Sequence, residues 1–175
     1  GRDADAIKET QNSIGLKPNY PDAYTFSGQV MLNSGRLVEA EEMLLTSLSK
    51  NPPYHKVIVY NPRDYDYKPM MELSKVYYQM SQPQKALPLL EACLKIYPGR
   101  KDIATNIEYM KKEVEQQKEV EDLIESVKDM DDSKALKKLN KSKYSQHPLL
   151  QYYRNRRFVK TESSGRDIAI YCYPT

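Results

Sequence analysis

Apolar side chains recur at three- and four-residue steps along most of the chain, the spacing that places them on one face of an α-helix. Over 21–54 this pattern predicts two helices joined by a turn at 33–36, with the first helix starting at Pro21. The inner faces are expected to be Tyr24, Gly28 and Met31 in the first helix and Ala40, Leu44 and Leu48 in the second. Gly28 is expected where the second helix must approach closely.

The segment 67–100 has the same plan, with a turn at 81–83 and a stop at Tyr97, Pro98 and Gly99. Its inner faces are expected to be Met70, Leu73, Ser74 and Tyr77, then Ala86, Leu90, Cys93 and Leu94. An insertion, 55–66, separates this segment from the first.

Both segments belong to a repeating pattern with a period of 34 residues. Ala6 and Pro18 are followed by Ala40 and Pro52, each 34 residues later, and Ala86 and Pro98 keep the same separation as these pairs. A fixed period in this range is typical of stacked supersecondary units. The segment 1–20 then reads as a partial repeat, whose helix 3–17 lacks the helix that should precede Gly1.

The remainder of the chain predicts a capping helix at 101–129, a basic helical connector at 130–165 and, at 166–175, the start of a truncated following domain. In the connector, Asp132 or Ser133 is expected to cap a helix containing Leu136 and Leu139. A second connector helix is expected over 149–158, with Pro148 near its start. The β-prone run 168–173 is expected to form a short orphan strand.

The two full repeats resemble tetratricopeptide repeats, whose pattern is an aromatic residue, Leu-Gly, Tyr, Ala, an aromatic residue and Pro. The matching positions are Tyr24, Ser27, Gly28, Met31, Ala40, Leu44 and Pro52, then Met70, Leu73, Ser74, Tyr77, Ala86, Leu90 and Pro98. The resemblance covers 1–100 and extends toward 129. It implies an all-α fold, a right-handed helical-hairpin solenoid (an α-α superhelix) occupying 1–129, with a long C-terminal helix.

A second resemblance is to the N-terminal tetratricopeptide region of certain bacterial, phage or environmental glycosyltransferases. It is carried by 61–70 and by His147, Pro148, Arg157 and 167–172. It implies catalytic domains beyond Thr175, so no catalytic residue is carried over and the chain itself is not expected to be an enzyme.

Composition and charge bear on the class of protein and on the kinds of site it could contain. Hydrophobic residues make up 39% and charged residues 29%, and no stretch offers the roughly 18–20 apolar residues that span a bilayer. Cys93 and Cys172 show no metal-ligand spacing and read as reduced thiols of a cytoplasmic protein, and His55 and His147 are isolated. We therefore expect no metal and no cofactor.

Helical hairpins in a solenoid line a concave groove with their first helices. The groove candidates by helical phase are Thr25, Phe26, Gln29, Asn33, Lys68, Glu72, Lys75, Gln79, Thr105, Asn106 and Tyr109. Phe26 suits either packing or a peptide anchor. A Lys-based carboxylate clamp is disfavoured, because Glu72 lies beside Lys75. The insertion carries Tyr54, Tyr60, Tyr65 and Tyr67 beside Arg63, which suit packing onto their own repeat or a ligand-binding loop.

The segment 134–160 contains no acidic residue. Its cations are Lys134, Lys137, Lys138, Lys141, Lys143, Arg154, Arg156, Arg157 and Lys160. It reads as a solvated connector that balances the acidic 113–132, or as a contact for an acidic partner or an anionic surface, a membrane or RNA.

The leading hypothesis is a noncatalytic module that mediates protein–protein interaction by holding a protein or peptide in the groove. The accessory region of a glycosyltransferase and an anion-binding connector are the alternatives, with nucleic acid the least favoured partner. Self-association through helix 3–17 or strand 167–173 is also expected, because uncovered apolar faces and strand edges attract partners.

Overall fold

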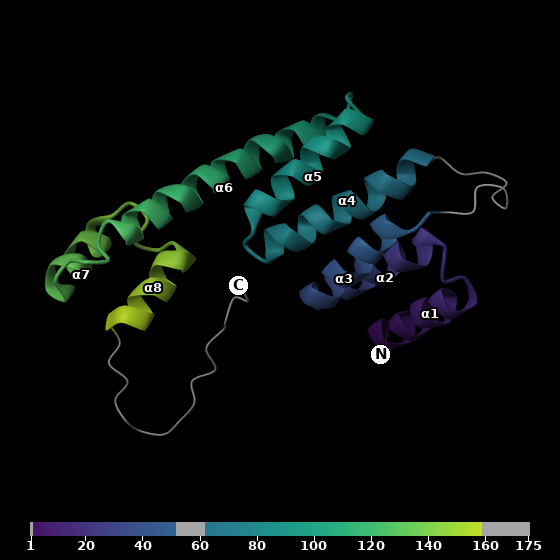
Figure 1. The fold of residues 1–175 in the computed structure, drawn as a ribbon, viewed down its shortest axis with the longest axis horizontal. Helices are drawn as coiled ribbons and strands as arrows, with labels where there is room; N and C mark the ends of the chain where they lie inside the picture. The colour runs from purple at the N-terminus through teal and green to yellow at the C-terminus, as the bar shows by residue number, and fades with distance from the viewer. Residues whose placement is uncertain (1, 52–61, 159–175) are drawn as a thin grey trace, which may run out of the picture. The chain divides into compact units, whose positions relative to one another are not determined.

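A computed structural model describes residues 2–51 and 62–158 of the chain, and all side chains among them except those of 2–4 and 62–64. Within these residues every regular element is a helix, so the all-α class is confirmed for the described part (Figure 1). The helices are α1 (Arg2–Leu16), α2 (Pro21–Asn33), α3 (Leu37–Ser49), α4 (Pro62–Gln79), α5 (Pro83–Ile96), α6 (Lys101–Glu125), α7 (Asp132–Lys141) and α8 (Pro148–Phe158). The expected strand 168–173 lies outside the described residues.

The chain forms two compact units, Gly1–Lys111 and Lys112–Thr175, called here the first and the second unit. The first holds α1 to α5 and the start of α6. The second holds the rest of α6 with α7 and α8. The division falls inside α6, near the polar stretch 113–119, whereas the predicted solenoid extends to 129. None of the described helices is both long and apolar enough to cross a membrane.

Successive helices of the first unit pack against one another as two hairpins, α2 with α3 and α4 with α5. In addition, α1 packs on α2, α3 packs on α4, and the first helices of the hairpins, α2 and α4, also meet. Their apolar stripes form one core, whose fully buried members include Ala40, Leu44, Val76, Ala86 and Cys93. Ile103, Ile107 and Met110 extend this core from α6.

The close approach expected at Gly28 is present. A methyl group built at this position would lie 2.5 Å from Cγ of Leu44, which is itself fully buried. A side chain at residue 28 would therefore require Leu44 or the packing around it to shift.

The two hairpin turns have the same backbone. Gly35 and Ser81 both adopt positive φ, 73° and 57°, at the end of the first helix. The following amide, of Arg36 or Gln82, donates to the carbonyl five residues earlier, at 2.9 and 2.8 Å. This pattern is the Schellman motif, which satisfies carbonyls left open at a helix end.

Two helix ends differ from the predicted segment limits. The first helix of the 67–100 repeat begins at Pro62, so the last part of the predicted insertion 55–66 is helical. Proline suits the first turn of a helix, because the amide it lacks has no partner there. The capping helix ends at Glu125, before 129, and hydrogen-bonded turns follow it.

The second unit has a smaller core. Val120, Val127, Ala135, Leu139 and Leu150 are fully buried there, and side chains such as Leu123, Tyr153 and Phe158 cover them in part. The core joins the last turns of α6 to α7 and α8.

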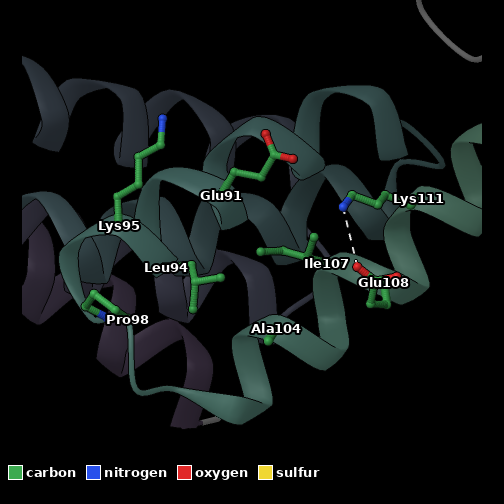
Figure 2. A pocket seen from close by; sticks show the side chains of 8 residues that line it. All are labelled: Glu91, Leu94, Lys95, Pro98, Ala104, Ile107, Glu108 and Lys111. Carbon is green, nitrogen blue, oxygen red and sulfur yellow. Dashed lines mark hydrogen bonds and ion pairs between the residues drawn. The ribbon is translucent and has the colours of Figure 1, made fainter.

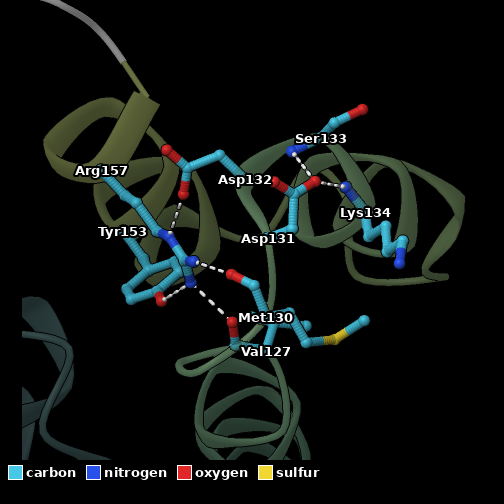
Figure 3. Close-up of polar contacts among 8 residues, drawn as sticks. All are labelled: Val127, Met130, Asp131, Asp132, Ser133, Lys134, Tyr153 and Arg157. Carbon is cyan, nitrogen blue, oxygen red and sulfur yellow. Dashed lines mark hydrogen bonds and ion pairs between the residues drawn. The ribbon is translucent and has the colours of Figure 1, made fainter.

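A single arginine closes the connection between α6 and α7 (Figure 3). Arg157, on α8, donates to the carbonyls of Val127 at 2.6 Å and Met130 at 2.5 Å. It also donates to the Tyr153 hydroxyl at 2.9 Å and pairs with Asp132 at 3.0 Å. Its planar guanidinium can serve several acceptors at once, which explains how one side chain holds the turn.

The cap of α7 differs from the prediction. Asp131 is the N-cap, and its carboxylate accepts from the amides of Ser133 and Lys134 (Figure 3). The prediction placed the cap at Asp132 or Ser133. Asp132 is instead the first residue of the helix and is available to Arg157.

Candidate partner-binding surface

The predicted groove residues lie on α2, α4 and α6 of the first unit, and most reach the surface. Phe26 is 56% exposed, which is unusual for a phenylalanine. Gln29 and Glu72 are half-buried. The exposed members are Phe26, Asn33, Lys68, Lys75, Gln79, Thr105, Asn106 and Tyr109.

Thr25 is the exception. It is buried, and its hydroxyl shares a 2.7 Å hydrogen bond with the hydroxyl of Ser47 on α3. Ser47 also donates to the Pro21 carbonyl at 3.0 Å. Thr25 therefore contributes to the packing of α2 on α3 and does not belong to the exposed surface.

An aromatic pair connects α4 to α6. The rings of Tyr78 and Tyr109 meet edge to face with centroids 6.0 Å apart, and their hydroxyl oxygens are 3.2 Å apart. The two side chains are 44% and 46% exposed. Tyr78 was missed in the sequence analysis, although it lies three residues after Lys75 and so shares its helix face.

Two opposite charges on α4 form a local ion pair. Lys75 donates to the Glu72 carboxylate at 2.8 Å. The Glu72 carboxylate is therefore bound to the ammonium group that a clamp for a C-terminal carboxylate would need.

The described tyrosines at the start of α4 have structural contacts. The Tyr65 hydroxyl donates to Asp22 on α2 at 3.2 Å. Tyr67 packs on the core and meets Tyr97 edge to face at 4.8 Å, with Arg100 over its ring. Arg100 also holds Asp102 at 2.6 Å, and this hydrogen bond lowers the pKa of Asp102 to about 2.

Tyr67 and Tyr65 therefore fit packing onto neighbouring helices. The predicted roles of Tyr54, Tyr60 and Arg63 lie outside the described side chains.

A hollow of about 530 Å³ opens between α5 and α6 of the first unit (Figure 2). It has an apolar floor and a charged rim, on which Lys111 pairs with Glu108 at 3.4 Å. Its lining is Glu91, Leu94, Lys95, Pro98, Ala104, Ile107, Glu108 and Lys111. None of the predicted groove residues lines this hollow.

The described side chains offer little for covalent or metal chemistry. Cys93 is fully buried, its thiol lies 3.7 Å from the Tyr67 carbonyl, and burial raises its pKa to about 11. A thiol held protonated in this way is a poor nucleophile. Within the described ranges, no three residues of the metal-ligating types come together as a site.

The described cations of the segment 134–160 fall into two groups. Arg157 and Arg154 are used inside the second unit, Arg154 donating to Asn140 at 2.6 Å and to the Ser145 carbonyl. Lys143 pairs with Glu119 at 2.9 Å, and Glu119 also accepts from the Tyr144 hydroxyl. The lysines of α7 form the second group and are exposed.

Comparison with known proteins finds no matching family model, no matching curated protein and no matching solved structure.

Proposed function

We propose that the first unit is a noncatalytic tetratricopeptide-type module that binds a peptide segment of a partner protein across α2, α4 and α6. The observations that carry the proposal are the exposed ring of Phe26 on α2 and the exposed pair Tyr78 and Tyr109, which joins α4 to α6; these three side chains are called the aromatic surface. Rigid aromatic side chains supply large contact area and dominate binding energy at many interfaces.

The repeat interpretation is supported by the equivalence of the hairpins α2–α3 and α4–α5. The same turn geometry recurs at Gly35 and Ser81, and the same buried positions recur as Ala40 and Ala86. The contact between α2 and α4 puts first helices side by side, as stacked repeats require. A surface built on packed helices is ordered before binding, so association loses less conformational entropy.

The test begins with selection of peptides from a displayed library on the intact chain. The affinity of a selected peptide is then measured for F26A and Y78A and for two control variants, V38A and L45A. Val38 and Leu45 are exposed apolar residues of α3, 64% and 46% exposed, outside the proposed surface. We expect the first two variants to weaken binding at least about tenfold and the controls to bind normally.

Failure to select any peptide, or binding lost in V38A and L45A but retained in F26A and Y78A, would contradict the proposal. Circular dichroism of each variant checks that the fold is retained. The glycosyltransferase reading depends in part on the run 167–172, which lies outside the described residues, and it stays a prediction.

A further inference from the structure

Four lysines of α7 form one continuous face. At 100° per residue, Lys134, Lys137, Lys138 and Lys141 fall within an arc of about 100° on the helix. They border an open hollow of about 620 Å³ in the second unit, whose lining also includes Leu123, Met130 and Ser142. These four side chains are called the lysine face.

The charge of the lysine face is not compensated inside the second unit. Like charges three and four residues apart on a helix repel one another. Among the described residues no carboxylate pairs with these lysines, and Lys138 donates to the neutral hydroxyl of Ser126 at 2.9 Å. By contrast, Lys143 and Arg157 each have an acidic partner, Glu119 and Asp132. The uncompensated charge favours an anionic occupant.

The floor of the hollow is apolar. Leu123 and Met130 are half-buried at the edge of the second core and line the hollow together with the lysines. Methionine adapts to the shape of apolar groups that dock on it. A nucleic-acid backbone would satisfy the lysines but not this floor, and no aromatic residue lines the hollow for a base to stack on.

We propose that the lysine face and its apolar floor bind an acidic amphipathic helix of a partner protein. Its Asp and Glu side chains would pair with the lysines, while Leu-type side chains would enter the hollow between them. This is the helix-in-groove mode of peptide recognition. The site lies in the second unit and shares no residue with the aromatic surface, so it is independent of the function proposed for the first unit.

The experiment uses the full chain and a fluorescein-labelled peptide of repeating Glu-Glu-Leu-Leu units, followed by fluorescence anisotropy. The test variant is K134Q/K137Q/K141Q. The matched control is K101Q/K112Q/K118Q, which removes the same net charge from exposed positions of α6. We expect the test variant to lose about tenfold in affinity, equivalent to about 1.4 kcal/mol, and the control to bind as the parent chain does.

Two further measurements separate charge from shape. M130Q keeps the net charge and is expected to weaken binding, and a peptide with Ser in place of Leu is expected to bind more weakly than the original. Phosphatidylserine vesicles and poly-uridine RNA serve as alternative probes. Equal losses in both triple variants, or equal binding of the Ser and Leu peptides, would overturn the proposal. So would lysine-face-dependent binding of vesicles or RNA without binding of the peptide.

The F26A and Y78A variants are expected to bind the Glu-Glu-Leu-Leu peptide normally. Failure of one proposal is therefore distinguishable from failure of the other.

Discussion

The two hairpins of the first unit, α2–α3 and α4–α5, share a backbone conformation. They differ in the side chains that pack at equivalent positions. The buried pair Thr25 and Ser47 is joined by a hydrogen bond, whereas its counterpart in the second hairpin is Met71 and Cys93, half-buried and fully buried. Replacing both partners of a buried hydrogen bond with apolar groups can be nearly neutral, while replacing one leaves an unsatisfied group. In the second hairpin both members differ, and the Cys93 thiol keeps the contact with the carbonyl 26 residues earlier that Ser47 makes in the first.

Other positions differ without a paired change. Gly28 corresponds to Ser74, and Gly35 corresponds to Ser81. The first hairpin thus has glycine at the helix contact and in the turn, where the second tolerates serine. The two hairpins therefore share their geometry, whereas the residue types that each position accepts depend on its own neighbours.

The largest effect is expected from the shared core position Leu44. L44A removes a fully buried side chain and is expected to destabilise the first unit by about 2–5 kcal/mol. L45A, in the next position but 46% exposed, should change stability by less than about 0.5 kcal/mol. Urea unfolding followed by circular dichroism measures both. Equal effects of the two variants would mean that α3 does not present the face described.

Because of the close contact at Gly28, the two hairpins should respond differently to alanine at equivalent positions. G28A is expected to cost about 1–3 kcal/mol, because the new methyl group meets the buried Leu44. S74A should cost less, since Ser74 already has a Cβ and loses only a hydroxyl that donates to the Met71 carbonyl at 2.7 Å. In G28A/L44A the two effects should be less than additive, because the shortened side chain relieves the clash. Strict additivity in the double-mutant cycle would argue against the contact.

Substitutions in the two hairpin turns are expected to have opposite effects on stability. G35A places a β-carbon at a φ of 73° and is expected to cost about 1 kcal/mol. S81G removes the same strain from the second turn, at φ 57°, and should stabilise by about 0.5–1 kcal/mol after the added chain entropy of glycine is subtracted. Thermal midpoints should move in opposite directions. A shift of the same sign would show that the two turns are not equivalent.

Alkaline pH should act on the second hairpin through Cys93 and Tyr77. Burial raises the pKa of Cys93 from 9.0 to about 11. Burial, followed by interaction with Glu41, raises the pKa of Tyr77 from 10.0 to about 12. Both groups are neutral when protonated and ionise first in the unfolded chain. Their contribution is therefore complete below about pH 9 and is lost as pH rises through 9–11 for Cys93 and 10–12 for Tyr77.

The pH prediction is measured as the urea midpoint at several pH values for the parent chain and C93A. The variant should show a smaller decline between pH 9 and 11, whatever its stability at neutral pH. A decline that is unchanged in C93A would indicate that the thiol is not buried in the folded state.

Local patterns were sufficient for much of the first unit. The three- and four-residue steps identified the buried face of α2 and α3, and Pro21 and Gly35 marked a helix start and a turn because their backbone preferences are intrinsic. Local patterns were insufficient where several neighbouring residues suit the same structural role, such as the N-cap of a helix. Asp131, Asp132 and Ser133 all suit an N-cap, and the structure assigns Asp131 while Asp132 pairs with Arg157.

The candidate surface shows the same limit. Phase along a helix placed Phe26 and Tyr109 at the surface. It also placed Thr25 there, because phase gives no information about Ser47 on the next helix, whose hydroxyl is hydrogen-bonded to that of Thr25. Tyr78 lies on the helix face of Lys75 and could have been included by phase, but its pairing with Tyr109 could not be predicted, because Tyr109 is on another helix.

The sequence by itself determined the helical class, the two equivalent hairpins and most of their buried positions, because these follow from side-chain periodicity and from the backbone preferences of proline and glycine. Only the tertiary structure decided which cations are internal and which remain free to act. Arg157 and Lys137 both read as cations in the sequence, but Arg157 meets the carbonyls of a turn that lies 27–30 residues away along the chain, whereas Lys137 borders an open hollow. Distance along the chain carries no information about such partners, since they meet only after the helices have packed.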